Sequence, residues 1–417
     1  CDASTQVQMR LGNLEDVERS EGEEIGLRVF VGKRSATVSS SDMDPEILSS
    51  LVGRAIDMAK EAPEDQYAGL APEELLLKSD PHPIEGDDGQ NPEPELLREL
   101  ALKAEDAARS VKGVTNSEGG GANAGRTIVA LATSHGFSGA YSTSGYSISA
   151  SVIAGQGDGM ERDYAYDSAR FLEDLQSPDT IGREAGERAV SRLNPVQFQS
   201  GAMPVVYDPR VGNSLLGHFV GAISGAAIAR KTSFLLDALD TEVFDSAISI
   251  IDCPHRKRGL RSKAFDGEGL PTAKTKLIDQ GRLTQWIMES ASARQLGLQP
   301  TGHASRGIGG APGVSVTNLH MGNGSVSKAD LIRDIKHGVY ITELIGMGVN
   351  QVTGDYSRGA SGFLITDGEI GPPVSEITIA GNLKDMFKSL VAADDLEYRY
   401  SINVPTLRAD SMTVAGG

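Results

Sequence analysis

The chain contains few cysteine and aromatic residues and no long apolar segment. Its 417 residues include two cysteines, Cys1 and Cys253, and 5% aromatics. Two thiols cannot form a disulfide framework, and this scarcity is typical of proteins that fold in a reducing compartment. No apolar run approaches the ~18 residues of a membrane span, and no signal-peptide pattern is present. We therefore expect a soluble, cytoplasmic protein with no membrane partner. Because the chain opens on Cys1 without Met, we also expect a leading element to be removed or disordered.

Positive charge is scarce as well. Lys and Arg number 39 against 57 Asp and Glu, which gives a formal net charge of −18. A field of this sign repels phosphate backbones, so nucleic-acid binding would need a strong local basic patch. The best candidate, HRKRGLR at residues 255–261, is more typical of a solvated turn or of ion-pair partners. We expect no nucleic-acid partner.

The chain does contain enough apolar residues for a sizeable core, together with many glycines. Hydrophobic residues make up 39% of the chain, and glycines number 49. The length exceeds that of a usual single domain. We predict an α+β fold with an N-terminal α/β-type domain over residues 1–195, which includes a linker at about 72–94, and a β-rich C-terminal domain over residues 196–417.

Local patterns place the individual elements. Alternation of apolar and polar residues predicts strands at 6–11, 26–31, 35–38, 126–132, 146–153, 161–166 and 203–207. Asp-Pro and Ser-Pro pairs at 44–45, 177–178 and 208–209 are typical of helix N-termini. Helices are predicted at 45–60, 95–111, 178–193, 209–229, 289–296, 329–336 and 383–390.

The order of elements suggests a possible internal duplication in the N-terminal domain. Strand, turn, strand and capped helix occur in that order over residues 26–60 and again over residues 126–193. Two unrelated α+β segments with similar turn and cap residues are the alternative, which one sequence leaves open.

The histidines do not form a recognisable metal site. There are seven, at positions 82, 135, 218, 255, 303, 320 and 337. No two lie four or five residues apart, as a ligand pair on one helix would require. A hydrolytic zinc needs about three protein ligands and a nearby Glu to accept a proton from the bound water. Cys253 and His255 flank a proline in a predicted turn and lack a third ligand nearby. We predict no metal ligands and no catalytic residues in this chain.

Other catalytic and binding motifs are equally incomplete. GDYSRG at 354–359 resembles a nucleophile elbow, but the glycine precedes Ser357 by three positions and a strand follows. The glycines at 119–121 and 346–348 lack the other residues of a phosphate loop. The acidic turns at 266–269 and 367–369 lack the spacing of a calcium loop. Tight turns explain all five segments.

Several segments together resemble the TldD/PmbA family, also called modulators of DNA gyrase. They are AFDGEGLPTAKTKLI (264–278), TGHASR (301–306), VTGDYSRGASGFLI (352–365), DGEI (367–370), IAGNL (379–383) and PTL (405–407). ISGAAIARKTSFL (223–235) and DCPHRKRGLR (252–261) resemble the PmbA branch, also called TldE. The likeness covers nearly the whole chain.

The resemblance implies a two-subunit cytosolic metalloprotease in which a TldD-like partner carries zinc. In that partner a helix bears His-Glu-x-x-x-His, and a cysteine near the C-terminus completes the coordination. The partner's motif can be aligned with this chain through the leucines at 215–216. In that alignment Gly217 and Ala222 occupy the two histidine positions, and His218 occupies the glutamate position. Shifting the alignment by one residue places His218 at the first histidine position. Phe219 and Ile223 then occupy the positions of the glutamate and the second histidine. No cysteine follows Cys253, so zinc is expected in the partner and no cofactor in this chain.

We therefore expect a non-catalytic subunit that pairs with a TldD-like chain to form a closed chamber for unfolded or small peptides. Helix 209–229 and the turn at 346–362 are expected to line its cleft, with His218, Asp355, Ser357 and Arg358 as candidate cleft residues. The alternative is an independent hydrolase or peptidase, active as a homodimer and centred on His218, Asp355 and Ser357. A DNA-associated regulator, a third class, draws only on the family's older name, and the net charge argues against it.

Overall fold

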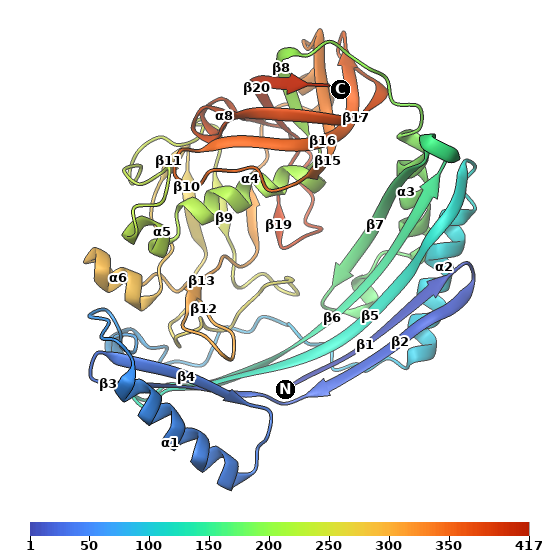
Figure 1. Ribbon diagram of the computed structural model, residues 1–417. Helices are drawn as coiled ribbons and strands as arrows, with labels where there is room; N and C mark the ends of the chain where they lie inside the picture. The colour runs from blue at the N-terminus through green and yellow to red at the C-terminus, as the bar shows by residue number, and fades with distance from the viewer. Residues whose placement is uncertain (417) are drawn as a thin grey trace.

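The computed structural model describes residues 1–416 and shows a mixed α+β molecule of two large lobes. We call them the sheet lobe, which is built on a curved antiparallel sheet, and the C-terminal lobe, which begins at residue 200 (Figure 1). A small unit of two strands and one helix lies at one end of the sheet lobe. The predicted α+β class is confirmed.

The sheet lobe contains five antiparallel strands in the order β2-β1-β5-β6-β7. Their bounds are β1 Asp2–Arg10, β2 Asn13–Gly22, β5 Val114–Ala132, β6 Ser138–Ala154 and β7 Glu161–Ala169. Two helices, α2 (Pro94–Arg109) and α3 (Pro178–Ser191), cover one face. The other face looks towards the C-terminal lobe (Figure 1). The sheet is therefore covered by its own helices on one side only.

Small residues allow the two helices to pack closely on the sheet and on each other. A Cβ at Gly120 of β5 would lie 2.2 Å from the carbonyl oxygen of Ala101 in α2. A Cβ at Gly182 of α3 would lie 2.2 Å from the carbonyl oxygen of Ala104. Only glycine fits at either contact, since real Cβ atoms do not approach so near. Backbone-to-backbone contact thus sets the spacing in this layer.

The small unit contains β3 (Ile25–Val31), β4 (Arg34–Ser40) and α1 (Pro45–Glu61). Its two strands form a sheet of their own, and the helix packs on it through Leu51 and Ala55 against Val38. The two segments compared as a possible duplication therefore differ in arrangement. Residues 26–60 form this separate unit, whereas residues 126–193 contribute to the five-stranded sheet and to α3.

The C-terminal lobe contains a sheet that closes on itself. Its order is β17-β16-β15-β8-β20-β18, and a further pairing of β17 with β20 completes a ring of five strands. The bounds are β8 Gly201–Tyr207, β15 His337–Ile345, β16 Asp355–Thr366, β17 Glu369–Asn382, β18 Val391–Ala392 and β20 Leu407–Ala415.

A second, mostly antiparallel sheet with the order β11-β10-β9-β14-β19 completes this lobe. Its strands are β9 Ile250–Asp252, β10 Thr275–Asp279, β11 Arg282–Leu283, β14 Leu319–Met321 and β19 Ile402–Asn403, and a small pair is formed by β12 Ala304–Ser305 and β13 Gly313–Val314. The helices are α4 Pro209–Ala222, α5 Gly225–Ala229, α6 Ser290–Leu296, α7 Lys328–Ile332 and α8 Leu383–Ser389. Residues of α4 and of both sheets share one hydrophobic core.

The helix predicted at 209–229 is in fact two helices. α4 ends at Ala222, and α5 begins at Gly225 with Ser224 as its N-cap. Between them the backbone turns outward to pair with Ile287, which donates to Ile223 (3.1 Å) and accepts from Gly225 (2.8 Å). The prediction was wrong here because a contact with Ile287, more than 60 positions further along the chain, interrupts the helical hydrogen bonds.

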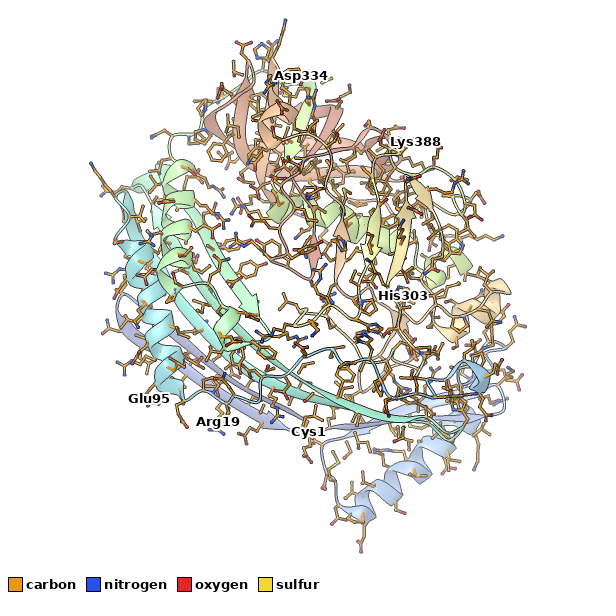
Figure 2. All side chains as sticks on the ribbon, turned by 180° about the vertical axis from the view of Figure 1, so that it is seen from behind. Cys1, Arg19, Glu95, His303, Asp334 and Lys388 are labelled. Carbon is orange, nitrogen blue, oxygen red and sulfur yellow. The ribbon has the colours of Figure 1, made fainter. Side chains whose placement is uncertain are left out.

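The segment predicted as a linker contacts both lobes. Short 3-10 helices occur at Glu73–Leu75, Gly157–Gly159 and Leu172–Asp174. Asp88 accepts hydrogen bonds from the Tyr146 hydroxyl (2.7 Å) and the Leu172 amide (3.1 Å). The carbonyl of Ile84 accepts from the Arg258 amide of the C-terminal lobe (3.1 Å). Seen from behind, Arg19 and Glu95 lie on the sheet lobe, and Asp334 and Lys388 on the C-terminal lobe (Figure 2).

Replacing Gly182 by alanine tests the close packing of α2 and α3. The added methyl group would collide with the Ala104 carbonyl and with Ala107, so we expect Gly182→Ala to lower the free energy of unfolding by about 1–3 kcal/mol. Gly53→Ala in α1 is the matched control, because a Cβ there meets nothing within 4 Å; it should raise stability by about 0.5–1 kcal/mol. Urea denaturation measures both, and equal effects at the two positions would contradict the packing argument.

Candidate functional site

The start of α4 is anchored on both sides by Asp208. Its Oδ1 accepts a hydrogen bond from the backbone N–H of Arg210 (3.0 Å), which caps the helix, and Pro209 occupies the first turn. The other oxygen, Oδ2, accepts from the Tyr340 hydroxyl on β15 (2.6 Å). The Asp-Pro signal therefore specifies where α4 begins, and Tyr340 holds that start against the closed sheet.

One face of α4 is buried and the other is open. Leu215, Leu216 and Phe219 lie in the core of the C-terminal lobe. Gly217 is exposed, and a Cβ built on it would meet nothing within 4 Å. His218 is half-buried between these two faces. Ala222, the third residue of the predicted pseudo-site, is fully buried in the same core. The pseudo-site is therefore divided between an exposed Gly217, a half-buried His218 and a buried Ala222.

The candidate residues of β16 lie on two opposite faces of the strand. Tyr356 and Arg358 are buried, whereas Asp355 and Ser357 are exposed on the other face. This follows from the period of two, which sends successive side chains to opposite faces. The structure therefore brings His218 and Arg358 together. It places Asp355 and Ser357 on the opposite face of β16.

His218 lies against Tyr356 and beside Arg358. Its ring meets the Tyr356 ring edge to face, with centroids 6.0 Å apart and planes at 77°. Its buried Nε2 atom has no hydrogen-bond partner. Burial, and then the charge of Arg358, lower the pKa of His218. The imidazole is therefore neutral at pH 7.

Arg358 is a buried cation without a carboxylate beside it. The side chain is 8% exposed, and its Nε donates to the carbonyl oxygen of Ile345 (3.3 Å). Within residues 1–416 it forms no ion pair. The titratable groups that its charge affects are Tyr207, Tyr356 and His218. Burial raises the pKa of Tyr356 to about 12, so this tyrosine stays protonated and the surroundings of the guanidinium are neutral.

These residues do not fit a zinc ion. Gly217 and Ala222, at the positions where the resemblance places histidines in the partner, have no side-chain donors. His218 could offer one nitrogen, but the Arg358 guanidinium beside it would repel a cation. Tetrahedral zinc needs about three protein ligands, so the site has the wrong donors and the wrong charge.

Asp355 and Ser357 organise the turn before β16. Asp355 accepts hydrogen bonds from the Thr353 hydroxyl (2.6 Å) and the Asn382 amide (3.1 Å). These two hydrogen bonds lower the pKa of Asp355. The backbone N–H of Ser357 donates to the Gly348 carbonyl (2.7 Å). Both residues serve the local backbone. The turn predicted for GDYSRG lies just before it, at residues 351–353, and Asp355 and Ser357 already belong to β16.

Sequence reasoning missed two members of this cluster, Tyr356 and Gln351. The Tyr356 hydroxyl and the Gln351 Oε1 atom are buried and lack hydrogen-bond partners. A Cβ at Gly221 would lie 3.7 Å from the Gln351 amide, so this side chain lies against the open face of α4. Alternation along β16 could have identified Tyr356, which flanks the two candidates at 355 and 357. No local signal identifies Gln351, because only the fold places its loop beside α4.

The remaining histidines have other partners. His82 and His255 stack with parallel rings 4.3 Å apart. The Nε2 atom of His303 lies 3.5 Å from Asp252 in the interior. Burial lowers the pKa of His320 to about 4. In residues 1–416 no group of three His, Cys, Asp or Glu side chains has the arrangement of a metal site.

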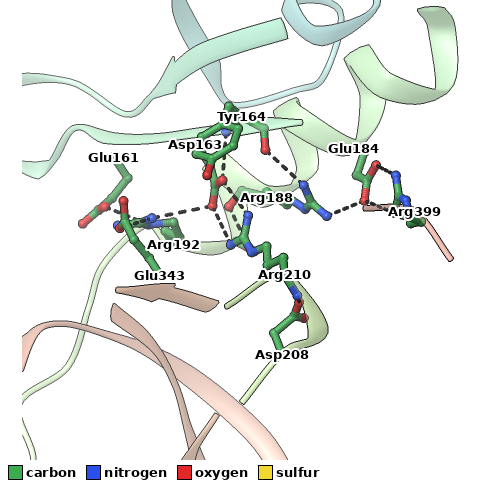
Figure 3. A network of polar contacts seen from close by, with 11 residues as sticks. Glu161, Asp163, Tyr164, Glu184, Arg188, Arg192, Asp208, Arg210, Glu343 and Arg399 are labelled. Carbon is green, nitrogen blue, oxygen red and sulfur yellow. Dashed lines mark hydrogen bonds and ion pairs between the residues drawn. The ribbon is translucent and has the colours of Figure 1, made fainter. Parts of the chain in front are cut away.

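A buried ion network ties α4 to the sheet lobe (Figure 3). Asp163 of β7 receives two hydrogen bonds from Arg210 at the start of α4, at 2.9 and 3.1 Å. Arg192, just after α3, contacts Asp163 (3.6 Å) and also pairs with Glu161 (3.2 Å) and with Glu343 of β15 (2.6 Å). The Asp163 side chain is 3% exposed. Two arginines and three carboxylates thus join the lobes next to the candidate site.

Asp163 should make stability depend on pH in the acid range. Burial alone would raise its pKa, but the hydrogen bonds and charges of Arg210 and Arg192 hold it below the ordinary value. Its contribution is then present above the unfolded pKa of ~3.9 and is lost as the pH falls through the lower folded pKa. We expect Asp163→Asn to lower the free energy of unfolding by about 3–5 kcal/mol at pH 7. The difference from the wild type should shrink below about pH 4.

Chemical denaturation at pH 7, 5, 4 and 3 measures this effect. Asp57→Asn on α1 is the control, because it removes an exposed pair with Lys60 worth less than about 1 kcal/mol. A constant difference between wild type and Asp163→Asn down to pH 3 would show that the carboxylate charge is not what joins the lobes.

Within residues 1–416, none of the helices combines the length and the apolar character needed to cross a bilayer.

Comparison with known proteins identifies the family. Residues 2–59, 87–193 and 200–416 match domain 1, the central domain and the C-terminal domain of the PmbA/TldA metallopeptidases. The chain is 39% identical to the metalloprotease PmbA of Escherichia coli O157:H7, with 98% of this chain and 89% of that protein covered. It is 38% identical to a PmbA homologue of Haemophilus influenzae over the same shares.

The fold of this chain matches that of solved structures over nearly its full length. A putative modulator of DNA gyrase from Bacteroides thetaiotaomicron has a TM-score of 0.90 and 26% identity, with 100% of this chain and 93% of that chain covered. TldE from Thermococcus kodakarensis shares the fold, with a TM-score of 0.84, 20% identity and coverage of 100% and 95%. The chain belongs to the PmbA/TldD metallopeptidase family.

Proposed function

We propose that this chain is a non-catalytic subunit of a two-subunit zinc metalloprotease, in which a TldD-like partner holds the zinc and cuts the peptide. The observation that supports the proposal is the composition of α4 at the positions where the family resemblance places zinc ligands. Where a zinc helix would present two histidines and a glutamate, this chain presents Gly217, His218 and Ala222, beside the buried Arg358 guanidinium. A cation is disfavoured there, and within residues 1–416 no carboxylate pairs with Arg358.

The sheet lobe supports a role in holding substrate. The face opposite α2 and α3 carries uncharged side chains that can form hydrogen bonds. In register across four strands lie Gln8, Gly121, Ser149 and Tyr166, and the next row contains Gln6, Asn123, Ser147 and Ser168. Neutral hydrogen-bonding groups suit the backbone of an extended peptide whatever its side chains. This face looks towards the C-terminal lobe and its helix α4 (Figure 1), so it can form one wall of a chamber.

Metal content and proteolysis of the separate and joint subunits test this assignment. The chain would be purified alone and after co-expression with a TldD-like chain. We expect no bound zinc and no cleavage of an unfolded protein by the chain alone, and one zinc per heterodimer with cleavage by the complex. Elemental analysis and gel assays measure both.

A matched pair of variants tests which of the two subunits binds the zinc. His218→Ala in this chain should leave the zinc content of the complex unchanged, whereas alanine at the first histidine of the partner's zinc motif should abolish it. Stoichiometric zinc and proteolysis in the isolated chain, both lost in His218→Ala, would overturn the proposal.

A further inference from the structure

The buried charge of Arg358 has no counterion in the residues described. A guanidinium that is 8% exposed loses much of its hydration, and this is costly without a paired anion. Its one protein hydrogen bond acceptor is a backbone carbonyl, that of Ile345. The nearby groups are neutral, because His218 has a lowered pKa and burial raises the pKa of Tyr207 and Tyr356. A chain of net charge −18 thus maintains a local positive site.

Three further polar groups on or beside α4 lack hydrogen-bond partners. They are the Nε2 atom of His218 on α4, the hydroxyl of Tyr356 on β16 and the Oε1 atom of Gln351 in the preceding loop. Buried polar atoms in folded proteins nearly always have a hydrogen-bond partner, so several orphans in one place point to a bound group. Three separate elements deliver them to the same side of α4.

The cluster lies at an open surface. Gly217 and Gly221 of α4 are exposed, and a Cβ at Gly217 would meet nothing within 4 Å. The Gln351 amide lies against Gly221, one helical turn from His218. A ligand could therefore approach these groups along the glycine face of the helix.

We propose that Arg358, Tyr356, His218 and Gln351 form a binding site for a carboxylate, and that its ligand is the C-terminal carboxylate of a peptide. The guanidinium fork matches a carboxylate in geometry and charge, and the Tyr356 hydroxyl supplies another donor. The acceptor oxygen of Gln351 would bind the N–H group that precedes the carboxylate. One buried cation balances one negative charge, which favours a carboxylate over a doubly charged phosphate.

The choice of a peptide as the ligand rests on the proposed function, but the carboxylate chemistry rests on the cluster alone. The two can fail separately. Zinc in the isolated chain would overturn the proposed function, whereas the binding experiment below measures an anion site with no reference to metal or proteolysis.

Isothermal titration of the full chain with four probes at pH 7 tests the site. The probes are N-acetyl-Ala-Ala-Ala, its C-terminal amide, the amidated peptide N-acetyl-Ala-Glu-Ala-NH2, and inorganic phosphate. We expect the free acid to bind and its amide to bind at least about tenfold more weakly. Equal binding of the glutamate peptide would overturn the assignment to a C-terminal carboxylate, because the site would then accept side-chain carboxylates as well. Equal binding of acid and amide, no binding of either carboxylate, or a preference for phosphate would overturn the proposal.

Substitutions then assign the binding to these residues. Arg358→Met should abolish it, Tyr356→Phe should weaken it several-fold, and Arg98→Met on the exposed surface of α2 should leave it unchanged. The Tm of Arg358→Met should not fall below that of the wild type, because it removes an unpaired buried charge; a structural arginine would lower the Tm on removal. Undiminished binding in Arg358→Met would refute the assignment.

A second measurement covers the case in which Arg358→Met does not fold. The Hε1 resonance of His218 in the wild type, assigned with His218→Ala, would be titrated with and without the free-acid peptide. A bound carboxylate offsets the charge of Arg358, so the midpoint should move to higher pH. The amide should not move it, and an unchanged midpoint with saturating free acid would place the ligand elsewhere.

Discussion

The buried contact between Asp163 and Arg210 is the interaction on which the arrangement of the site depends. It joins β7 of the sheet lobe to the first turn of α4, and Arg192 extends it to Glu343 of β15 (Figure 3). Two arginines facing three carboxylates in a largely desolvated place are stable only together, since removing one partner leaves a buried charge uncompensated. The open face of α4 is therefore held at a defined position relative to the uncovered face of the sheet. Neither surface could serve one ligand if the lobes moved independently.

The chemistry at that surface is electrostatic. In a fold whose family is named for metallopeptidases, α4 carries glycine and alanine at the two positions where the resemblance leads us to expect zinc ligands in a TldD-like partner, and an arginine lies beside its one histidine. A guanidinium excludes a metal ion and attracts an anion. A few side chains can thus decide which sign of charge one backbone binds, and this is the physical basis of the division of labour that we propose between a zinc-bearing chain and a substrate-holding chain.

Local signals predicted most of the elements correctly, and errors arose where distant residues intervene. Helices that begin with Asp44-Pro45, Ser177-Pro178 and Asp208-Pro209 start at those positions, because a cap acts within one turn. β2 was not predicted, because its ten residues are all exposed and lack the alternation of a half-buried strand. The end of α4 was missed because Ile287 supplies the competing hydrogen bonds. His218 and Arg358 were identified from motifs, whereas Gln351 and Tyr356 were not.

By itself the sequence determined the family, the α+β class and the absence of ligand side chains at Gly217 and Ala222, since these depend on residue identity and local pattern. Only the tertiary structure decided that Arg358 is buried without a carboxylate and near Tyr356 and His218, while Ser357 lies on the other face of β16. It also decided that Gln351 reaches α4. The reason is physical. The cost of a charge depends on the solvent and dipoles around it, and those are supplied by elements far apart along the chain.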